Sequence, residues 1–518
     1  MKVLRSLYLA ALTGTLALGG SAQALVFDPA TGVKGTLQLP DGRSVSYTGY
    51  EKIFYVEQVE DPAYQYLNIY VPEGAGPKAP IFLRTYVGGY MASAAAAPQA
   101  TDASGRALAE GFVVAIPGTR GRNSVIKADE NYAQAHPGVS VGDEIYTGRA
   151  PAAILDLKAA VRYLRHFASK IPADANHIIT DGTSAGGAMS ALLGATGNRP
   201  EYEPYLKAMG AAAEKDDVFA SVCFCPITDL EHADMAYEWL YSGTSSRQSL
   251  DEQHRAYSQE LAALYPQYLN SLKLKTPDGK VLNADNYLDF LKAQLIRAAQ
   301  LAKDAGAEIP QDIGFSFSSS ARGGFAAPVD GKAPTGEPGA GPDKSKDGLP
   351  PRGSPQLGEY ITALDLAPYL DYVVSTQPLK TVPAFDSLIA GVNEPSGENG
   401  EFGDASGSNV NFTAFSAGKN DSEVSAEVKT NLSLLNPLHF VDDKKTAVAP
   451  HWYIRHGARD RDTAFTVPLN LYLKLKERGE DVNFLLAWNR PHSGDYSLNE
   501  LFSWLKEILK QPAGKAKK

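Results

Sequence analysis

Short apolar runs alternate with amphipathic segments along most of the chain. The apolar runs predict buried strands at 66–71, 81–86, 112–116, 178–179, 220–224, 452–455 and 482–487. Between them, apolar residues spaced three and four apart predict helices at 151–168, 465–478 and 496–510. Strands that alternate with helices in this way favour a mostly parallel sheet covered on both faces. The pattern therefore predicts an α/β fold.

The alternation stops near residue 230 and resumes near residue 450. The interval is helix-rich over 250–305, and 321–356 is rich in Gly, Pro and Lys with too few apolar residues to pack, which favours a flexible loop. We therefore predict an α/β domain formed by 25–230 and 440–515, interrupted by an inserted lid domain at 231–439.

Residues 1–24 have the pattern of a secretory signal. Lys2 and Arg5 supply the positive start, 7–19 are apolar, and Ala22-Gln23-Ala24 supplies small residues for cleavage. The apolar stretch is too short to cross about 30 Å of hydrocarbon, and no later run is long enough either. We expect export to the periplasm or medium after cleavage near Ala24, with no membrane segment in the mature form.

Charge and cysteine content limit the partners and ligands that the chain can bind. The net charge is −10 without basic clusters, which argues against nucleic acid as a partner. The only cysteines, Cys223 and Cys225, cannot form a disulfide framework, and Cys-x-Cys offers too few ligands for a metal. We expect buried structural thiols and neither a metal nor a cofactor.

The strongest chemical signal is a serine between two glycines. Gly182-Thr-Ser-Ala-Gly186 fits the G-x-S-x-G elbow, in which a strand turns sharply into a helix and exposes the serine as a nucleophile. A β-prone run precedes it and a helix-forming run follows it. Ser140 also lies in a G-x-S-x-G match, but Pro137 precedes it and no apolar strand surrounds it. The context therefore favours Ser184.

A serine nucleophile needs a base and an orienting acid, which follow it in the order acid, then histidine, in this fold class. His492 lies in the loop after the last predicted strand. His451 and His456 bracket the preceding strand, and we expect them to be satisfied structural groups. Asp460 and Asp462 both follow that strand, and spacing does not separate them as the acid.

An oxyanion hole requires two backbone N–H groups. One is expected from Ala185, directly after the serine, and the other from the glycine loop Val87-Gly-Gly-Tyr90, with Gly88 as the candidate.

Several stretches of the chain resemble bacterial tannases, the tannin acylhydrolases of the α/β-hydrolase superfamily. The most specific are Cys225-Pro-Ile-Thr and Arg455-His-Gly-Ala-Arg-Asp-Arg-Asp462. The other matching stretches are 87–91, 117–122, 150–165, 182–187, 226–239, Lys380 and 383–386. The resemblance extends over essentially the whole mature chain.

The resemblance implies an α/β-hydrolase fold with a large lid domain and hydrolysis of galloyl esters and depsides, with small-molecule tannins as substrates. It assigns the triad to Ser184, Asp460 and His492. It assigns the binding of the three hydroxyls of the galloyl ring to Lys380, Glu394 and Asp462. This set suits a trihydroxybenzoyl ring, since carboxylates accept phenolic hydrogens and an ammonium donates to a phenolic oxygen.

Three alternatives remain open at this point. The nearest is an esterase for feruloyl or chlorogenic esters with the same triad. A serine peptidase of the prolyl-oligopeptidase type normally carries a propeller, and no blade-length repeat is visible. A non-catalytic binding protein would lack a triad member, and none is missing.

Overall fold

The computed structural model describes residues 23–318, 360–375, 377–388 and 397–510. The predicted signal, apart from its last two residues, and the Gly/Pro-rich segment lie outside the described residues. Glu394 lies outside them as well.

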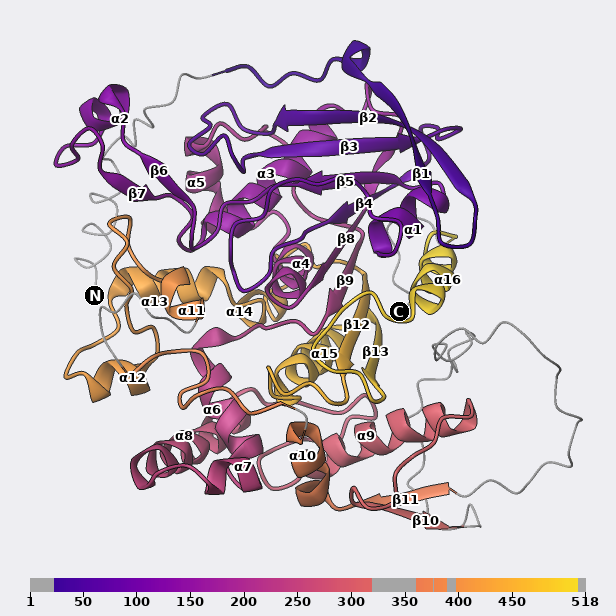
Figure 1. The fold of residues 1–518 in the computed structure, drawn as a ribbon, viewed down its shortest axis with the longest axis vertical. Helices are drawn as coiled ribbons and strands as arrows, with labels where there is room; N and C mark the ends of the chain where they lie inside the picture. Colours follow the sequence, from indigo (N-terminus) through magenta and orange to yellow (C-terminus); the bar gives the residue numbers. More distant parts are fainter. Residues whose placement is uncertain (1–22, 319–359, 376, 389–396, 511–518) are drawn as a thin grey trace, which may run out of the picture.

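A nine-stranded sheet forms the centre of the molecule (Figure 1). Its strands, in spatial order, are β1 (Val33–Gln38), β2 (Ser44–Phe54), β3 (Tyr66–Pro72), β5 (Val113–Pro117), β4 (Pro80–Arg84), β8 (Asp174–Thr183), β9 (Ala220–Phe224), β12 (His451–Gly457) and β13 (Asp481–Ala487). The junctions from β1 to β5 are antiparallel, and those from β5 to β13 are parallel. The expectation of a mostly parallel sheet is confirmed, whereas β1 and β2 were not predicted.

Helices cover both faces of the sheet because alternate strand residues point to opposite sides. In β4, Ile81 and Leu83 belong to the hydrophobic cluster of one face, while Phe82 belongs to that of the other. The first face is covered by α3 (Ala152–His166), α4 (Ala185–Ala195) and α15 (Thr466–Arg478), and the second by α1 (Ala103–Ala109) and α16 (Leu498–Ile508).

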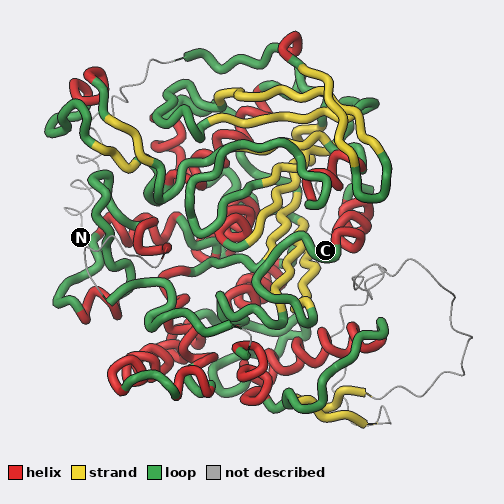
Figure 2. Tube along the Cα trace, in the orientation of Figure 1, coloured by secondary structure: helices red, strands yellow, loops and turns green. Residues whose placement is uncertain are grey.

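The segment between β9 and β12 is mainly helical (Figure 2). Its elements are α6 (Leu230–Tyr241), α7 (Ser245–Gln248), α8 (Glu252–Ser271), α9 (Tyr287–Asp304), β10 (Phe315–Ser318), β11 (Tyr360–Leu364), α10 (Leu366–Val374), α11 (Gly397–Glu401), α12 (Ala414–Lys419), α13 (Ala426–Leu434) and α14 (Leu438–Val441). Its buried side chains, such as Tyr287, Leu291 and Phe385, continue the cluster formed by α3 and α4. The insertion and the sheet therefore share one hydrophobic core.

Smaller elements complete the chain. They are two 3-10 turns at Pro29–Thr31 and Pro200–Tyr202, the antiparallel pair β6 (Val125–Lys127) and β7 (Glu144–Tyr146), and helices α2 (Glu130–Ala135) and α5 (Glu203–Ala208). Among the described residues, no helix has both the length and the apolar character needed to span a bilayer.

A buried ion pair fixes the insertion internally. Glu238 of α6 accepts hydrogen bonds from Arg247 of α7 at 2.6 and 2.9 Å and from Ser258 of α8 at 2.5 Å. Arg247 also donates to the carbonyl of Lys380 at 2.8 Å. One guanidinium thus joins two helices to the loop that carries Lys380.

We expect Arg247→Leu to lower the free energy of unfolding by about 3–5 kcal/mol, because it leaves the Glu238 carboxylate buried without its partner. Urea denaturation followed by circular dichroism measures the change. Arg43→Leu is the control, since its ion pair with Asp41 is about half exposed and contributes roughly 0–1 kcal/mol. Equal effects of the two substitutions would contradict the assignment.

Candidate active site

Ser184 lies at the turn between β8 and α4, with φ 62° and ψ −124°. The glycines around it are required by close packing. A Cβ at Gly182 would lie 2.2 Å from the carbonyl oxygen of Gly186, and one at Gly187 would lie 2.6 Å from that of Phe224. The turn therefore holds its serine in a left-handed conformation that the surrounding backbone imposes.

Ser184, His492 and Asp460 form an unbroken hydrogen-bonded chain. The Nε2 atom of His492 lies 2.8 Å from the Ser184 hydroxyl, and its Nδ1 lies 2.7 Å from Oδ2 of Asp460. Ser184 and His492 are partly exposed, whereas Asp460 is fully buried. Such a chain can transfer the serine proton to the imidazole while the carboxylate orients the ring.

The structure also distinguishes the two aspartates that spacing left open. Asp460 contacts the imidazole, and its other oxygen accepts a hydrogen bond from the backbone N–H of Asp462 at 2.8 Å. Asp462 is only half-buried, and its carboxylate pairs with Arg461 at 2.7 Å. Asp460 is therefore the carboxylate in position to orient His492.

Three tyrosines of the insertion hold the loop that carries Asp460. Tyr241 donates to the Asp460 carbonyl at 3.0 Å, and Tyr237 donates to that of Arg461 at 2.6 Å. Tyr369 donates to the carbonyl of Ala458 at 2.5 Å. The position of the acid is thus set partly from outside the α/β domain.

The two oxyanion-hole candidates lie on neighbouring segments. Ala185 is the first residue of α4 and is buried. The glycine loop after β4 approaches the elbow closely, since a Cβ at Gly186 would lie 2.7 Å from the carbonyl oxygen of Val87. Gly88 is exposed, and Gly89 and Tyr90 have positive φ angles. The loop can therefore present a backbone N–H beside Ser184.

Of the three residues expected to contact a galloyl ring, Lys380 and Asp462 lie on loops joined by one hydroxyl. Tyr237 accepts from the backbone N–H of Lys380 at 3.2 Å while it donates to the carbonyl of Arg461. The Lys380 ammonium lies 3.9 Å from the centre of the Phe385 ring.

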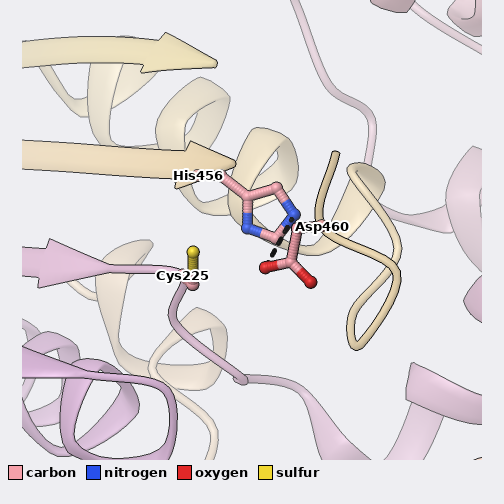
Figure 3. A group of neighbouring side chains, drawn as sticks. All are labelled: Cys225, His456 and Asp460. Carbon is pink, nitrogen blue, oxygen red and sulfur yellow. Dashed lines mark ion pairs between the residues drawn. The ribbon is translucent and has the colours of Figure 1, made fainter. Parts of the chain in front are cut away.

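Two residues near the acid were not predicted to be part of the site. Cys225 follows β9, His456 lies at the end of β12, and both approach Asp460 (Figure 3). The expectation that His456 is a satisfied structural group is met only in part. Its ring is fully buried and faces the Asp460 carboxylate at 3.6 Å, but neither ring nitrogen makes a hydrogen bond of normal geometry among the described residues. The prediction of buried thiols is confirmed, since both cysteines are buried and free.

A second ionic network lies beneath the elbow. Arg84 of β4 pairs with Asp181 of β8 and, at 2.6 and 2.9 Å, with Asp495 in the loop of His492. Burial raises the pKa of Asp181 against the opposing Arg84 cation, and the nearby Asp495 carboxylate adds to the rise. Arg84 thus links β8, the strand that precedes Ser184, to the loop that carries His492 and Asp495.

The pKa values of Asp460 and His492 shift in opposite directions. Burial raises the pKa of Asp460, but the charges of His456 and His492 and its hydrogen bonds hold that pKa well below its usual range. Burial lowers the pKa of His492, but the adjacent Asp460 carboxylate outweighs this and raises it above the ordinary value of histidine. The Asp460 carboxylate therefore stays ionised and is in position to stabilise an imidazolium.

An open, mostly parallel sheet with a serine at a strand-to-helix elbow defines the α/β-hydrolase class. The BD-FAE family model, an esterase family, matches residues 121–269. A stretch of 58 residues is 45% identical to Esterase LipC of Mycobacterium tuberculosis. This stretch covers 11% of this chain and 14% of that esterase.

Similarity to solved structures extends over nearly the whole chain. Fusobacterium nucleatum tannase is 33% identical, with a TM-score of 0.76. The tannin acyl hydrolase from Lactobacillus plantarum is 34% identical, with a TM-score of 0.77. Each comparison covers 94% of this chain and 99% of the other. The chain belongs to the bacterial tannase family, whose members are ester hydrolases of the α/β-hydrolase class.

We expect Asp460→Asn to move the acid limb of kcat/KM to lower pH. As the expected base, His492 must be neutral, and loss of the carboxylate lowers the pKa below which the ring is protonated. The kcat itself should fall by about 10⁴-fold, because the amide favours the wrong tautomer. A pH–rate profile on a simple ester tests this, with Asp41→Asn as the exposed control. An unshifted acid limb would exclude Asp460 as the partner of the base.

Proposed function

We propose that this protein is a serine ester hydrolase that cleaves galloyl ester and depside bonds of hydrolysable tannins and releases gallic acid. The observation that carries the proposal is the hydrogen-bonded chain from Ser184 through His492 to Asp460. A related tannin acyl hydrolase, 34% identical over 94% of this chain, has been solved in complex with ethyl gallate, which supports the substrate class.

The first half of the reaction is acyl transfer to the serine. His492 takes the proton of Ser184 as its oxygen attacks the galloyl carbonyl, and Asp460 stabilises the resulting imidazolium. The N–H groups of Ala185 and Gly88 donate to the oxyanion. The imidazolium then protonates the leaving alcohol or phenol, which leaves a galloyl-enzyme ester.

The second half repeats these steps with water. His492 takes a proton from water as it attacks the galloyl-enzyme carbonyl, and returns that proton to Ser184 when gallic acid leaves. The chemistry needs no group beyond these side chains and backbone amides.

We assign recognition of the galloyl group to Lys380, Glu394 and Asp462. Glu394 lies outside the described residues, and its role rests on the family resemblance alone. For the other two, Tyr237 links the backbone of Lys380 to that of Arg461, the neighbour of Asp462, and Asp462 and His492 offer atoms within 4.8 Å of one another, which supports a common binding surface next to His492. The insertion would serve as the lid over this surface, and the first 24 residues would direct export.

The nucleophile is tested with methyl gallate. Ser184→Ala should lower kcat by about 10³-fold or more, since nucleophile and base act as a unit, and His492→Ala should do the same. Gallate release is measured by chromatography, and circular dichroism verifies that each variant is folded. Ser140→Ala is the matched control and should retain full activity. Full activity in Ser184→Ala would exclude the elbow serine as nucleophile.

The acyl specificity is tested with a series of methyl esters. Methyl gallate should be cleaved best, the dihydroxybenzoate less well, and methyl benzoate or ferulate barely, because unpaired polar groups can cost up to about 10⁴-fold in kcat/KM. Lys380→Met and Asp462→Asn should flatten this ranking while sparing phenyl acetate. If wild type cleaves methyl ferulate as fast as methyl gallate, the protein is a general phenolic-acid esterase.

A further inference from the structure

A thiol and an imidazole lie beside the carboxylate of Asp460, the acid of the proposed triad (Figure 3). Cys225, His456 and Asp460 each offer a ligand atom, and these atoms all lie within 4.8 Å of one another. The parallel pairing of β9 with β12 brings them together, and the Cys225 N–H donates to the Arg455 carbonyl at 2.7 Å. All three residues are fully buried or nearly so.

The imidazole in this group lacks the hydrogen bonds that a buried histidine normally makes. Within the described part of the chain, neither ring nitrogen of His456 makes a hydrogen bond of normal geometry; the imidazole faces the Cys225 thiol and, at 3.6 Å, Oδ2 of Asp460. A buried polar ring left without hydrogen bonds costs stability. The site therefore holds an unused donor or acceptor next to a thiol and a carboxylate.

The donor set suits one class of ligand. Thiolate and imidazole prefer thiophilic divalent cations such as Zn²⁺ and Cd²⁺, whereas Mg²⁺ and Ca²⁺ require oxygen ligands. Because the three ligand atoms lie within 4.8 Å of one another, a cation can lie within about 2.8 Å of each of them. Small side-chain shifts of roughly 0.5–0.8 Å then give zinc its usual bonding distances.

We propose that Cys225, His456 and Asp460 form an inhibitory binding site for a thiophilic divalent cation. A bound Zn²⁺ takes Oδ2 of Asp460, the atom that accepts the hydrogen bond from Nδ1 of His492. It also places positive charge beside a ring that must become an imidazolium. The cation therefore switches off catalysis without occupying the substrate surface.

Because the ligands are buried, the cation must enter through transient opening of the site. Of the described contacts of Asp460, the side chain of His492 is partly exposed and lies 2.7 Å from the buried carboxylate. Inhibition should therefore develop slowly during preincubation, and should lower kcat rather than raise KM.

Binding is measured first with Cd²⁺ on chelator-treated full-length protein, by the ultraviolet thiolate-to-cadmium absorbance. Wild type should bind one equivalent with this signal. Cys225→Ser and Cys225→Ala should lose the signal, and Cys223→Ser should retain it, since Cys223 is a buried free thiol that instead contacts the Ser221 hydroxyl at 3.3 Å. No signal in wild type, or an unchanged signal in both Cys225 variants, overturns the proposal.

Inhibition is measured next with Zn²⁺ on methyl gallate. Wild type and Cys223→Ser should lose kcat by up to about 10⁴-fold, the cost of removing the orienting acid, and EDTA should restore it. Mg²⁺ should have no effect. Inhibition that persists unchanged in the Cys225 variants overturns the proposal and points to Asp460, Asp462 and His492, which also lie within 4.8 Å but include no thiol. The cadmium signal needs no substrate, so its outcome is separate from that of the proposed function.

Discussion

The buried carboxylate of Asp460 determines how the rest of this site is built. An isolated charge in a protein interior is costly, so it must be surrounded by hydrogen-bond donors and positive charge. Here the imidazole of His492 and the backbone N–H of Asp462 donate to its two oxygens, and His456 lies behind it. Each of these groups comes from a loop or strand end at the carboxyl ends of the parallel strands, so the sheet brings together the groups that surround the charge.

Much of this architecture follows from the sequence. Central strands are continuous apolar runs because both of their faces are covered, and helices show one apolar stripe, so both patterns are visible without coordinates. The elbow is equally readable, because its G-x-S-x-G pattern is local in the sequence, even though Gly186 and Gly187 pack against the distant residues Val87 and Phe224. β1 and β2 escaped prediction because few of their residues are buried and neither forms a continuous apolar run; β1 is the edge strand and β2 lies between it and β3.

The remaining parts of the site could not be predicted, because they depend on contacts between distant segments. Cys225 and His456 are 231 positions apart and meet only because β9 and β12 are neighbours in the sheet. Arg84 reaches Asp495 from the far end of the chain. The choice between Asp460 and Asp462 likewise rests on which carboxylate turns inward, and spacing along the chain carries no information about that direction.

The hydroxyl of Tyr237 has a consequence for how such enzymes can diverge. It belongs to the insertion, yet it binds both the backbone of Lys380 and the loop that carries the acid. A recombinant that exchanges the insertion for that of a relative would also replace a support of the acid loop. On the proposed assignment, the residues that set substrate range and turnover are therefore coupled, and compensating changes in 458–462 would have to accompany any such graft.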